Sequence, residues 1–213
     1  MNRFYHSKPL SINQAVILDD FSGHHALKVL RVRLNDDLIL FNGDGYDYKG
    51  RVTEINKKEI EITILTSTKK NRESPLKICL IQSLSSNEKM DWIIQKATEL
   101  GAYEIQPIFS ERSIIKISQD RIIKKLAHWK QVSISACEQC YRTEIPQIHQ
   151  PQKFMDYLNN TSFEDKALRL ILAPSASSKA NIFPTKEPNK VYVLIGPEGG
   201  FDKNEIQLAN SLN

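Results

Sequence analysis

Four short and almost continuously apolar runs in the last two thirds of the chain restrict its possible folds most strongly. They are LKICLIQS (76–83), EIQPIF (104–109), LRLILA (168–173) and VYVLI (191–195). Strands that are apolar at nearly every residue are typical of a sheet that is buried on both faces. Helical patterns separate the runs, so the sequence predicts an α/β domain with a mainly parallel sheet.

The first of these helices is expected to begin at Ser85, because Glu88 stands at the capping-box distance from it. Gly101 is expected to end the helix. Its apolar stripe would consist of Met90, Ile93, Ile94, Ala97 and Leu100. A second, longer helix is expected from about Ser118.

Residues 1–70 have a different pattern, with shorter apolar runs and alternating stretches. Ile60, Ile62 and Ile64 share one face of an expected strand. The segment predicts a compact β-barrel with one helix at about 22–33. The polar stretch STKKNRESP (67–75) is expected to be a linker. We therefore predict two domains, residues 1–70 and 76–213.

The helix expected at 22–33 carries His24, Lys28 and Arg31 at i, i+4 and i+7, a spacing that places them on one face. Arg3 and Lys8 are further basic residues in the same domain. Two interpretations remain open, a solvated helix face or a surface that binds phosphates. The net charge of +4 indicates nucleic acid only weakly.

Composition excludes several classes of protein. No apolar run approaches the ~20 residues of a membrane-spanning helix, and the start MNRFYHSKPL has no apolar core of a secretory signal. The three cysteines do not make a disulfide framework, so we expect a cytoplasmic protein. Cys137 and Cys140 form a C-x-x-C pair, but two further ligands at suitable spacing are missing, so we expect no metal.

The stretch GPEGG (196–200) follows the last apolar run, and Asp202 with Glu205 signals the start of a helix after it. This order places the glycines at the carboxyl edge of the sheet, where open α/β folds bind ligands. A tight turn would explain one or two glycines. Glu198 within the stretch would repel a phosphate, so we expect a ligand with a ribose, an adenine edge or a positive charge.

LIGPEGGF resembles the cofactor loop of the trefoil-knotted SPOUT methyltransferases. The motifs HHALKVLR, RESPL, EKMDWIIQKATELG, FSERS and ACEQCYR extend the resemblance to the family of ribosomal RNA small subunit methyltransferase E. The resemblance implies a PUA-like β-barrel followed by a SPOUT α/β domain. It also implies S-adenosylmethionine as cofactor, methyl transfer to N3 of a uridine in 16S rRNA, and a homodimer formed through the knotted domain.

The resemblance further implies roles for single residues. Catalysis would fall to Arg112, Glu138 and Arg142. The cofactor would be bound by Leu172, Ala173, Pro174, Gly196, Pro197, Glu198, Gly199 and Gly200. RNA would be bound by Arg3, His24, His25, Lys28 and Arg31. The base that takes the N3 proton is not identified, and Glu138 and Glu198 are both candidates.

The sequence departs from the family pattern at two places. Tyr141 stands where the family usually has a small residue, and the family's last cofactor segment, similar to LGPRILRTETA, is missing. Two explanations remain open. The natural protein continues past Asn213, or it is a shortened protein without catalysis, which would make it an rRNA-binding or ribosome assembly factor that retains the fold.

Overall fold

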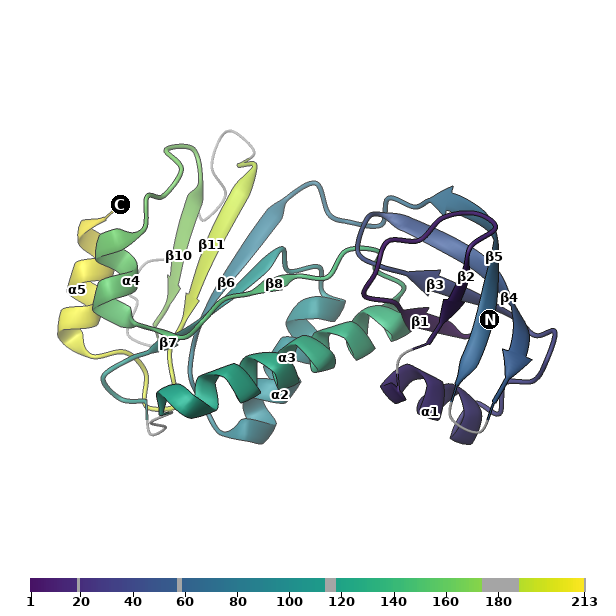
Figure 1. The fold of residues 1–213 in the computed structure, drawn as a ribbon. Coiled ribbons are helices and arrows are strands. Elements are labelled where there is room, and N and C mark those ends of the chain that lie inside the picture. Colours follow the sequence, from purple (N-terminus) through teal and green to yellow (C-terminus); the bar gives the residue numbers. More distant parts are fainter. Residues whose placement is uncertain (19, 57–58, 114–117, 174–187, 213) are drawn as a thin grey trace. The chain divides into compact units, whose positions relative to one another are not determined.

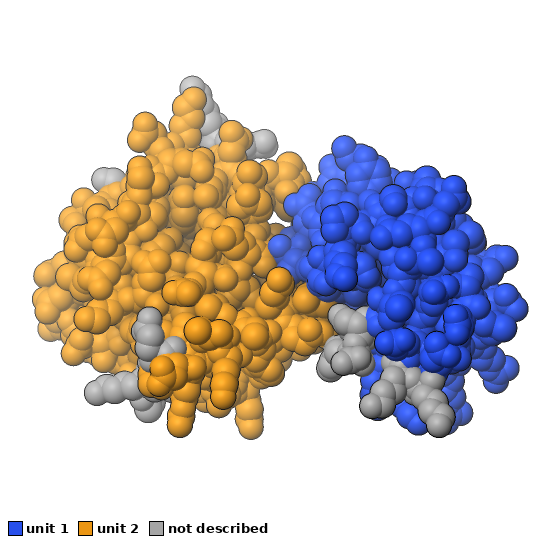
Figure 2. Space-filling model, in the orientation of Figure 1, with its two compact units in different colours: residues 1–73, 137–145 blue, residues 74–136, 146–213 orange. Residues whose placement is uncertain are grey.

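The computed structural model describes residues 1–18, 20–56, 59–113, 118–173 and 188–212. These residues form two compact units, which Figure 2 shows in different colours. Unit 1 comprises residues 1–73 and 137–145, and unit 2 comprises residues 74–136 and 146–213. The segment 137–145 therefore groups with the first unit, although it lies in the second half of the sequence. RNA binding by the first domain and methyl transfer by the second stay predictions.

Unit 1 contains one curled five-stranded sheet, the short helix α1 and the last residues of the long helix Gln119–Cys140 (Figure 1). The strands lie in the order β1-β3-β4-β5-β2, and only β1 and β3 pair in parallel. Ile60, Ile62 and Ile64 are fully buried, so the predicted apolar face is confirmed. The elements are β1 (Arg3–Tyr5), β2 (Ala15–Ile17), α1 (Asp20–Lys28), β3 (Asp37–Phe41), β4 (Tyr46–Ile55) and β5 (Ile60–Lys69).

Two predictions for unit 1 were wrong in their bounds. The helix α1 ends at Lys28, because the backbone N–H groups of both Val29 and Leu30 donate to the carbonyl of His25. Arg31 follows the helix with φ of +51° and so does not share a helical face with His24 and Lys28. The strand β5 continues to Lys69, so the predicted linker begins later than residue 67.

Unit 2 is built around a sheet in which every pairing is parallel, which confirms the prediction of a mainly parallel sheet. The strand order is β10-β11-β6-β7-β8, with β9 also paired to β7. The elements are β6 (Lys77–Ser83), α2 (Asn87–Glu99), β7 (Glu104–Phe109), α3 (Gln119–Cys140), β8 (Gln147–Ile148), β9 (Gln152–Lys153), α4 (Phe154–Asn160), β10 (Leu168–Leu172), β11 (Lys190–Ile195) and α5 (Lys203–Ser211).

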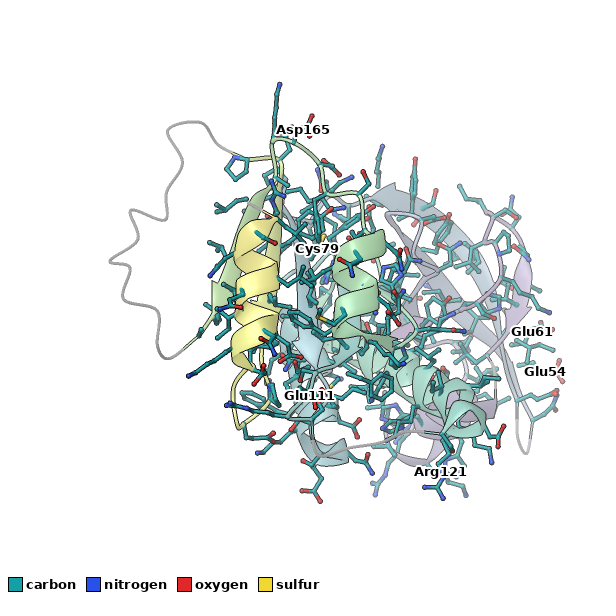
Figure 3. All side chains as sticks on the ribbon, turned by 90° about the vertical axis from the view of Figure 1, so that its left-hand side faces the viewer. Glu54, Glu61, Cys79, Glu111, Arg121 and Asp165 are labelled. Carbon is teal, nitrogen blue, oxygen red and sulfur yellow. The ribbon has the colours of Figure 1, made fainter. Side chains whose placement is uncertain are left out.

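Each face of this sheet is covered by its own pair of helices. On one face α4 and α5 bury a core that includes Cys79, Leu158 and Phe201. On the other face α2 and α3 bury a core that includes Ile94 and Trp129. Figure 3 shows α4 and α5 next to each other, with Cys79 labelled behind them in the interior. The strands are therefore buried on both sides, as their apolar runs predict.

The starts of two helices differ in how they follow the sequence signals. Asp202 caps α5, and its capping box with Glu205 is confirmed. The predicted capping box of Ser85 and Glu88 is wrong, because Ser86 is the N-cap of α2 and its side chain makes no cap hydrogen bond. Leu100, expected in the apolar stripe, is 82% exposed since it lies beyond the last turn of α2.

Candidate active site at the carboxyl edge of the sheet

The carboxyl ends of β6 and β11 form the switch point of the parallel sheet. The chain continues from β6 to β7 on one side of this pair, whereas it reaches β11 from β10 on the other side. The helices that follow the two strands, α2 and α5, accordingly pack in the cores on opposite faces. A doubly wound sheet opens its ligand crevice at this position. The glycine loop 196–200 follows β11 directly and therefore borders that crevice.

The glycines of the loop 196–200 are required for different reasons. A Cβ atom on Gly196 would lie 3.1–3.3 Å from Phe201, which is tighter than ordinary packing. Gly200 has φ of +68°, a conformation that favours glycine. A Cβ atom on Gly199 would meet Arg112 at 3.7 Å, an ordinary van der Waals contact. Packing and backbone conformation thus explain Gly196 and Gly200, whereas Gly199 leaves room for a ligand close to the backbone.

Arg112 reaches the glycine loop from the segment after β7. Its Nη1 donates a hydrogen bond to the carbonyl of Gly199 at 2.9 Å, and its Nη2 lies 3.8 Å from Oδ2 of Asp202. The backbone of the neighbouring Glu111 donates to Oε1 of Glu205 at 2.8 Å, and Figure 3 shows Glu111 near the start of α5. Half of the Arg112 side chain stays exposed. Arg112 therefore places an accessible positive charge next to the loop.

Glu198 projects from the loop toward the start of α2. Its Oε1 accepts hydrogen bonds from Oγ of Ser85 at 2.5 Å and from Nζ of Lys89 at 2.7 Å. The hydrogen bond from Lys89, with those from Ser85 and from the backbone of Glu198 itself, lowers the pKa of this carboxyl group to about 2. Glu198 is therefore ionised at neutral pH, and 45% of its side chain is exposed.

A cavity of about 600 Å³ begins at these residues and continues along the sheet face under α2. This volume lies in the range of about 300–1,000 Å³ that is usual for small-molecule sites. Its polar lining comes largely from Gln82, Ser85, Lys89 and Glu198, which follow or end the strands at the carboxyl edge. The apolar lining is formed by Ile78, Leu80, Trp92, Ile93, Ala97, Leu100, Ala102, Val193 and Ile195.

The other segment predicted to bind cofactor ends the neighbouring strand β10. Leu172 pairs with Ile195 in the sheet, so this segment and the glycine loop leave the sheet side by side. Leu172 is 55% exposed, and Ala173 is half-buried. Pro174 lies outside the described residues. The structure thus brings the two predicted cofactor segments together at one edge, while their contact with a cofactor stays a prediction.

The three residues predicted to be catalytic are divided between the two units. Arg112 belongs to unit 2, whereas Glu138 and Arg142 belong to unit 1. Arg142 is buried, and its Nη2 and Nε lie 2.5 Å and 2.9 Å from Oε2 of Glu73. Oε1 of Glu138 accepts a hydrogen bond from the backbone of Tyr5 at 2.9 Å. These contacts fix the segment 137–145 within unit 1.

The residues predicted to bind RNA also differ in accessibility. His24, Lys28 and Arg31 are exposed, and His25 is half-buried with its ring edge-on to Phe4. Arg3 is buried: its guanidinium contacts Asp47 and donates to the carbonyls of Cys137 and Arg142, both at 2.7 Å. These contacts favour a structural role for Arg3, and its binding to RNA stays a prediction.

Ser85 and Lys89 are site residues that the sequence did not indicate as such. Ser85 has the appearance of a helix cap in the sequence, and Lys89 that of a solvated lysine on the same helix. Their contacts with Glu198 join residues 113 and 109 positions apart, which no local pattern reveals. Within the described residues, no group of three or more His, Cys, Asp or Glu is arranged to hold a metal ion. None of the described helices is both long and apolar enough to cross a bilayer.

Comparison with known proteins gives matches along nearly the whole chain. Residues 72–213 match the family described as RNA methyltransferase domain, and residues 18–65 match the RNA methyltransferase PUA domain. The chain is 41% identical to ribosomal RNA small subunit methyltransferase E of Buchnera aphidicola subsp. Schizaphis graminum, over 96% of this chain and 82% of the relative. It is 30% identical to the protein of that name from Bacillus subtilis, over 86% of this chain and 74% of the relative.

Two solved structures resemble the chain closely. One is a ribosomal RNA small subunit methyltransferase E from Neisseria gonorrhoeae bound to S-adenosyl methionine, with a TM-score of 0.91 and 37% identity over 100% of this chain and 86% of the other. The second is a protein from Legionella pneumophila in complex with the bound cofactor SAM, with a TM-score of 0.92 and 36% identity over 99% of this chain and 86% of the other. The predicted fold class, a PUA-like domain followed by an α/β domain with a parallel sheet, is confirmed.

Proposed function

The chain belongs to the family of ribosomal RNA small subunit methyltransferase E, and from this premise we propose that it methylates N3 of a uridine in 16S rRNA. The methyl donor is S-adenosylmethionine. The observation that carries the proposal is the glycine loop at the switch point of the sheet, where Gly199 leaves space that the fold itself does not need. The finer assignment, to N3 of a uridine, rests on the resemblance of the motifs.

The residues at the carboxyl edge fit an adenosyl group. A ligand can approach the backbone of the loop closely at Gly199, because this residue has no side chain and a Cβ atom there would make only an ordinary contact with Arg112. Glu198 is an ionised acceptor for hydroxyl groups, and a carboxylate there disfavours a phosphate ligand. Leu172, Ala173 and Pro174 are proposed as the opposite wall. When bound, S-adenosylmethionine supplies an electrophilic methyl group.

The protein's task in this reaction is to hold and activate the uridine. N3 becomes a good nucleophile once its proton is lost, and the resulting negative charge spreads onto O2 and O4. Arg112 is proposed to stabilise that charge, since its accessible guanidinium lies beside the loop. Glu138 and Arg142 complete the proposed catalytic set, and their hydrogen bonds with Tyr5 and Glu73 support a role in fixing the segment 137–145.

We assign RNA binding to unit 1. His24, Lys28 and Arg31 are accessible to phosphates, and His25 borders them. Arg3 is kept in the proposed set for its position in the same unit. A homodimer formed through unit 2 and a site of action in the cytoplasm are proposed from the family resemblance.

The direct test is primer extension on 16S rRNA from a strain that lacks the gene. Methylation at N3 blocks base pairing, so reverse transcriptase stops at the modified uridine. The stop is expected in wild-type RNA, absent in the deletion strain, and restored by the intact gene. A normal stop in the deletion strain would contradict the proposed activity. Restoration by an Arg112→Ala variant would show that the modification does not require Arg112. An intact protein that takes up no S-adenosylmethionine in calorimetry would instead favour the alternative, a ribosome assembly factor without catalysis.

A further inference from the structure

The carboxylate of Glu198 is held from a distant part of the chain. Ser85 and Lys89 follow β6, whereas Glu198 follows β11, so their hydrogen bonds of 2.5 Å and 2.7 Å cross the switch point of the sheet. Ser85 is buried and does not cap α2, since Ser86 occupies that position. Its hydroxyl group is directed to Glu198 instead. The Ser85 hydroxyl therefore fixes the glycine loop and does not cap the helix α2.

We propose that Ser85 and Lys89 are positioning residues of the cofactor site, which hold Glu198 as an ionised acceptor for the ribose hydroxyls of the adenosyl group. The inference rests on the proposed function and extends it to two residues outside the glycine loop. A carboxylate offers about four lone-pair sites, and the two donors share a single oxygen, Oε1. The side chain of Glu198 is 45% exposed and lines the cavity, so acceptor capacity remains for a ligand.

The physical benefit of this arrangement is preorganisation. A glutamate at the tip of a loop samples several rotamers, and ligand binding would have to order its side chain at a cost in conformational entropy. Two donors fixed on the first turn of α2 and the segment before it order the carboxylate in advance. Lys89 also balances its charge, so the ionised form persists beside a partly apolar cavity.

Calorimetric titration of the full-length protein tests the proposal. Replacing Lys89 by Met should weaken binding of S-adenosylmethionine about tenfold, because a hydrogen bond to a charged group is lost. Lys89→Arg should restore most of the affinity, and Ser85→Ala should give a smaller loss. Lys130→Met is the matched control, since Lys130 is an exposed lysine on α3 and its removal changes the net charge equally. The control should bind like the wild type.

Two further readouts separate this role from a merely structural one. S-Adenosylhomocysteine carries the same ribose without the positive sulfur, so Lys89→Met should weaken both ligands equally. A loss confined to S-adenosylmethionine would overturn the ribose assignment. Without Lys89, the pKa of Glu198 should return from about 2 toward 4.5. The variant should therefore lose more affinity than the wild type when the pH is lowered to about 4.5.

The outcomes distinguish this inference from the proposed function. A Lys89→Met protein that binds both ligands like the wild type at both pH values would overturn the positioning role alone. A folded wild-type protein that binds neither ligand would overturn the proposed function, and this inference with it. Circular dichroism of every variant at both pH values establishes that the compared proteins are folded.

Discussion

Glu198 and Glu104 lie at opposite edges of the same parallel sheet, and hydrogen bonds lower the pKa of each to about 2. Glu104 begins β7 at the amino edge. Its Oε1 accepts from the thiol of Cys79 at 2.7 Å and lies 3.3 Å from Nζ of Lys190, while its Oε2 lies 3.0 Å from Nε2 of His149. Ser85 and Lys89, by contrast, both donate to one oxygen of Glu198, and its side chain is 45% exposed against 19% for Glu104.

This difference shows that a shifted pKa does not by itself identify a functional carboxylate. The partners of Glu104 occupy both of its oxygens, so it joins β6, β7, β11 and the end of β8 and has little capacity for a ligand. Burial, together with the hydrogen bond to Glu104, likewise raises the pKa of the Cys79 thiol to about 12, which makes it unreactive. At the carboxyl edge, hydrogen bonds lower the pKa of an accessible carboxyl group that borders a cavity.

The largest effect is expected from Arg112→Ala at the carboxyl edge. Loss of a donor directed at developing negative charge should reduce turnover by about 100- to 1,000-fold. The affinity for S-adenosylmethionine should change about tenfold or less, because one hydrogen bond to the loop is lost. Single-turnover kinetics and calorimetry measure the two quantities, with Arg121→Ala as an exposed control. Equal losses in both would mean that Arg112 only supports the loop.

The second effect distinguishes Gly199, where a larger side chain should weaken cofactor binding, from Gly196, where it should lower stability. Gly199→Val should weaken cofactor binding by about 10- to 100-fold, since overpacking costs ~1–3 kcal/mol. Its melting temperature should stay near that of the wild type, because space is available in the fold. Gly196→Val should instead destabilise the protein through the clash with Phe201. Wild-type affinity in folded Gly199→Val would remove the loop from the cofactor site.

The third effect concerns the amino edge. Glu104→Gln should lower the free energy of unfolding by about 2 kcal/mol at pH 7, since hydrogen bonds to a charged group are lost. The folded-state pKa of Glu104 lies below its ordinary value of 4.5. The ionised group therefore adds stability above pH 4.5, and this contribution disappears as the pH falls toward 2. Urea unfolding should show the gap between variant and wild type shrinking at low pH, and a gap independent of pH would contradict this account.

The smallest effect is expected at Tyr141, which lies at neither edge of the sheet. Here a substitution should raise the free energy of unfolding, in contrast to the losses predicted at the two edges. Tyr141 has φ of +65°, which costs a residue with a Cβ atom ~1 kcal/mol or more. Tyr141→Gly should therefore raise the free energy of unfolding by about 1 kcal/mol without changing cofactor affinity. Tyr141→Ala removes the ring but keeps the strain, so it should show no gain. A loss of stability in Tyr141→Gly would mean that the contact of the ring with the Arg72 guanidinium, 5.8 Å from its centre, outweighs the strain.

Patterns that are local in the sequence predicted much of this molecule. The apolar runs gave the parallel sheet, and Asp202 with Glu205 gave the start of α5, because strand burial and helix capping depend on residues close in sequence. The same signals failed at Ser85, where a partner 113 positions away competes for the hydroxyl group. They also failed at Arg31, since a turn in the left-handed region ends α1 early.

The sequence predicted where the candidate site lies in the fold, but it did not predict the contacts between its residues. The glycine loop and the end of β10 were expected at one edge, and strand pairing brings them together there. The role of Arg112 in holding the carbonyl of Gly199, and the burial of Arg3 and Arg142, depend on tertiary packing. A count of basic residues in a motif does not indicate which of them are ion-paired inside the fold.

The central claim is that the carboxyl edge binds the cofactor while the amino edge stabilises the sheet. The most direct measurement is a paired determination of cofactor affinity and melting temperature for Glu198→Gln and Glu104→Gln, by calorimetry on the same preparations. Glu198→Gln should lose about tenfold in affinity for S-adenosylmethionine, and its melting temperature should fall less than that of Glu104→Gln, because its side chain is more exposed to solvent. Glu104→Gln should keep its affinity and melt at a lower temperature. Reduced affinity in Glu104→Gln together with unchanged affinity in Glu198→Gln would contradict the claim.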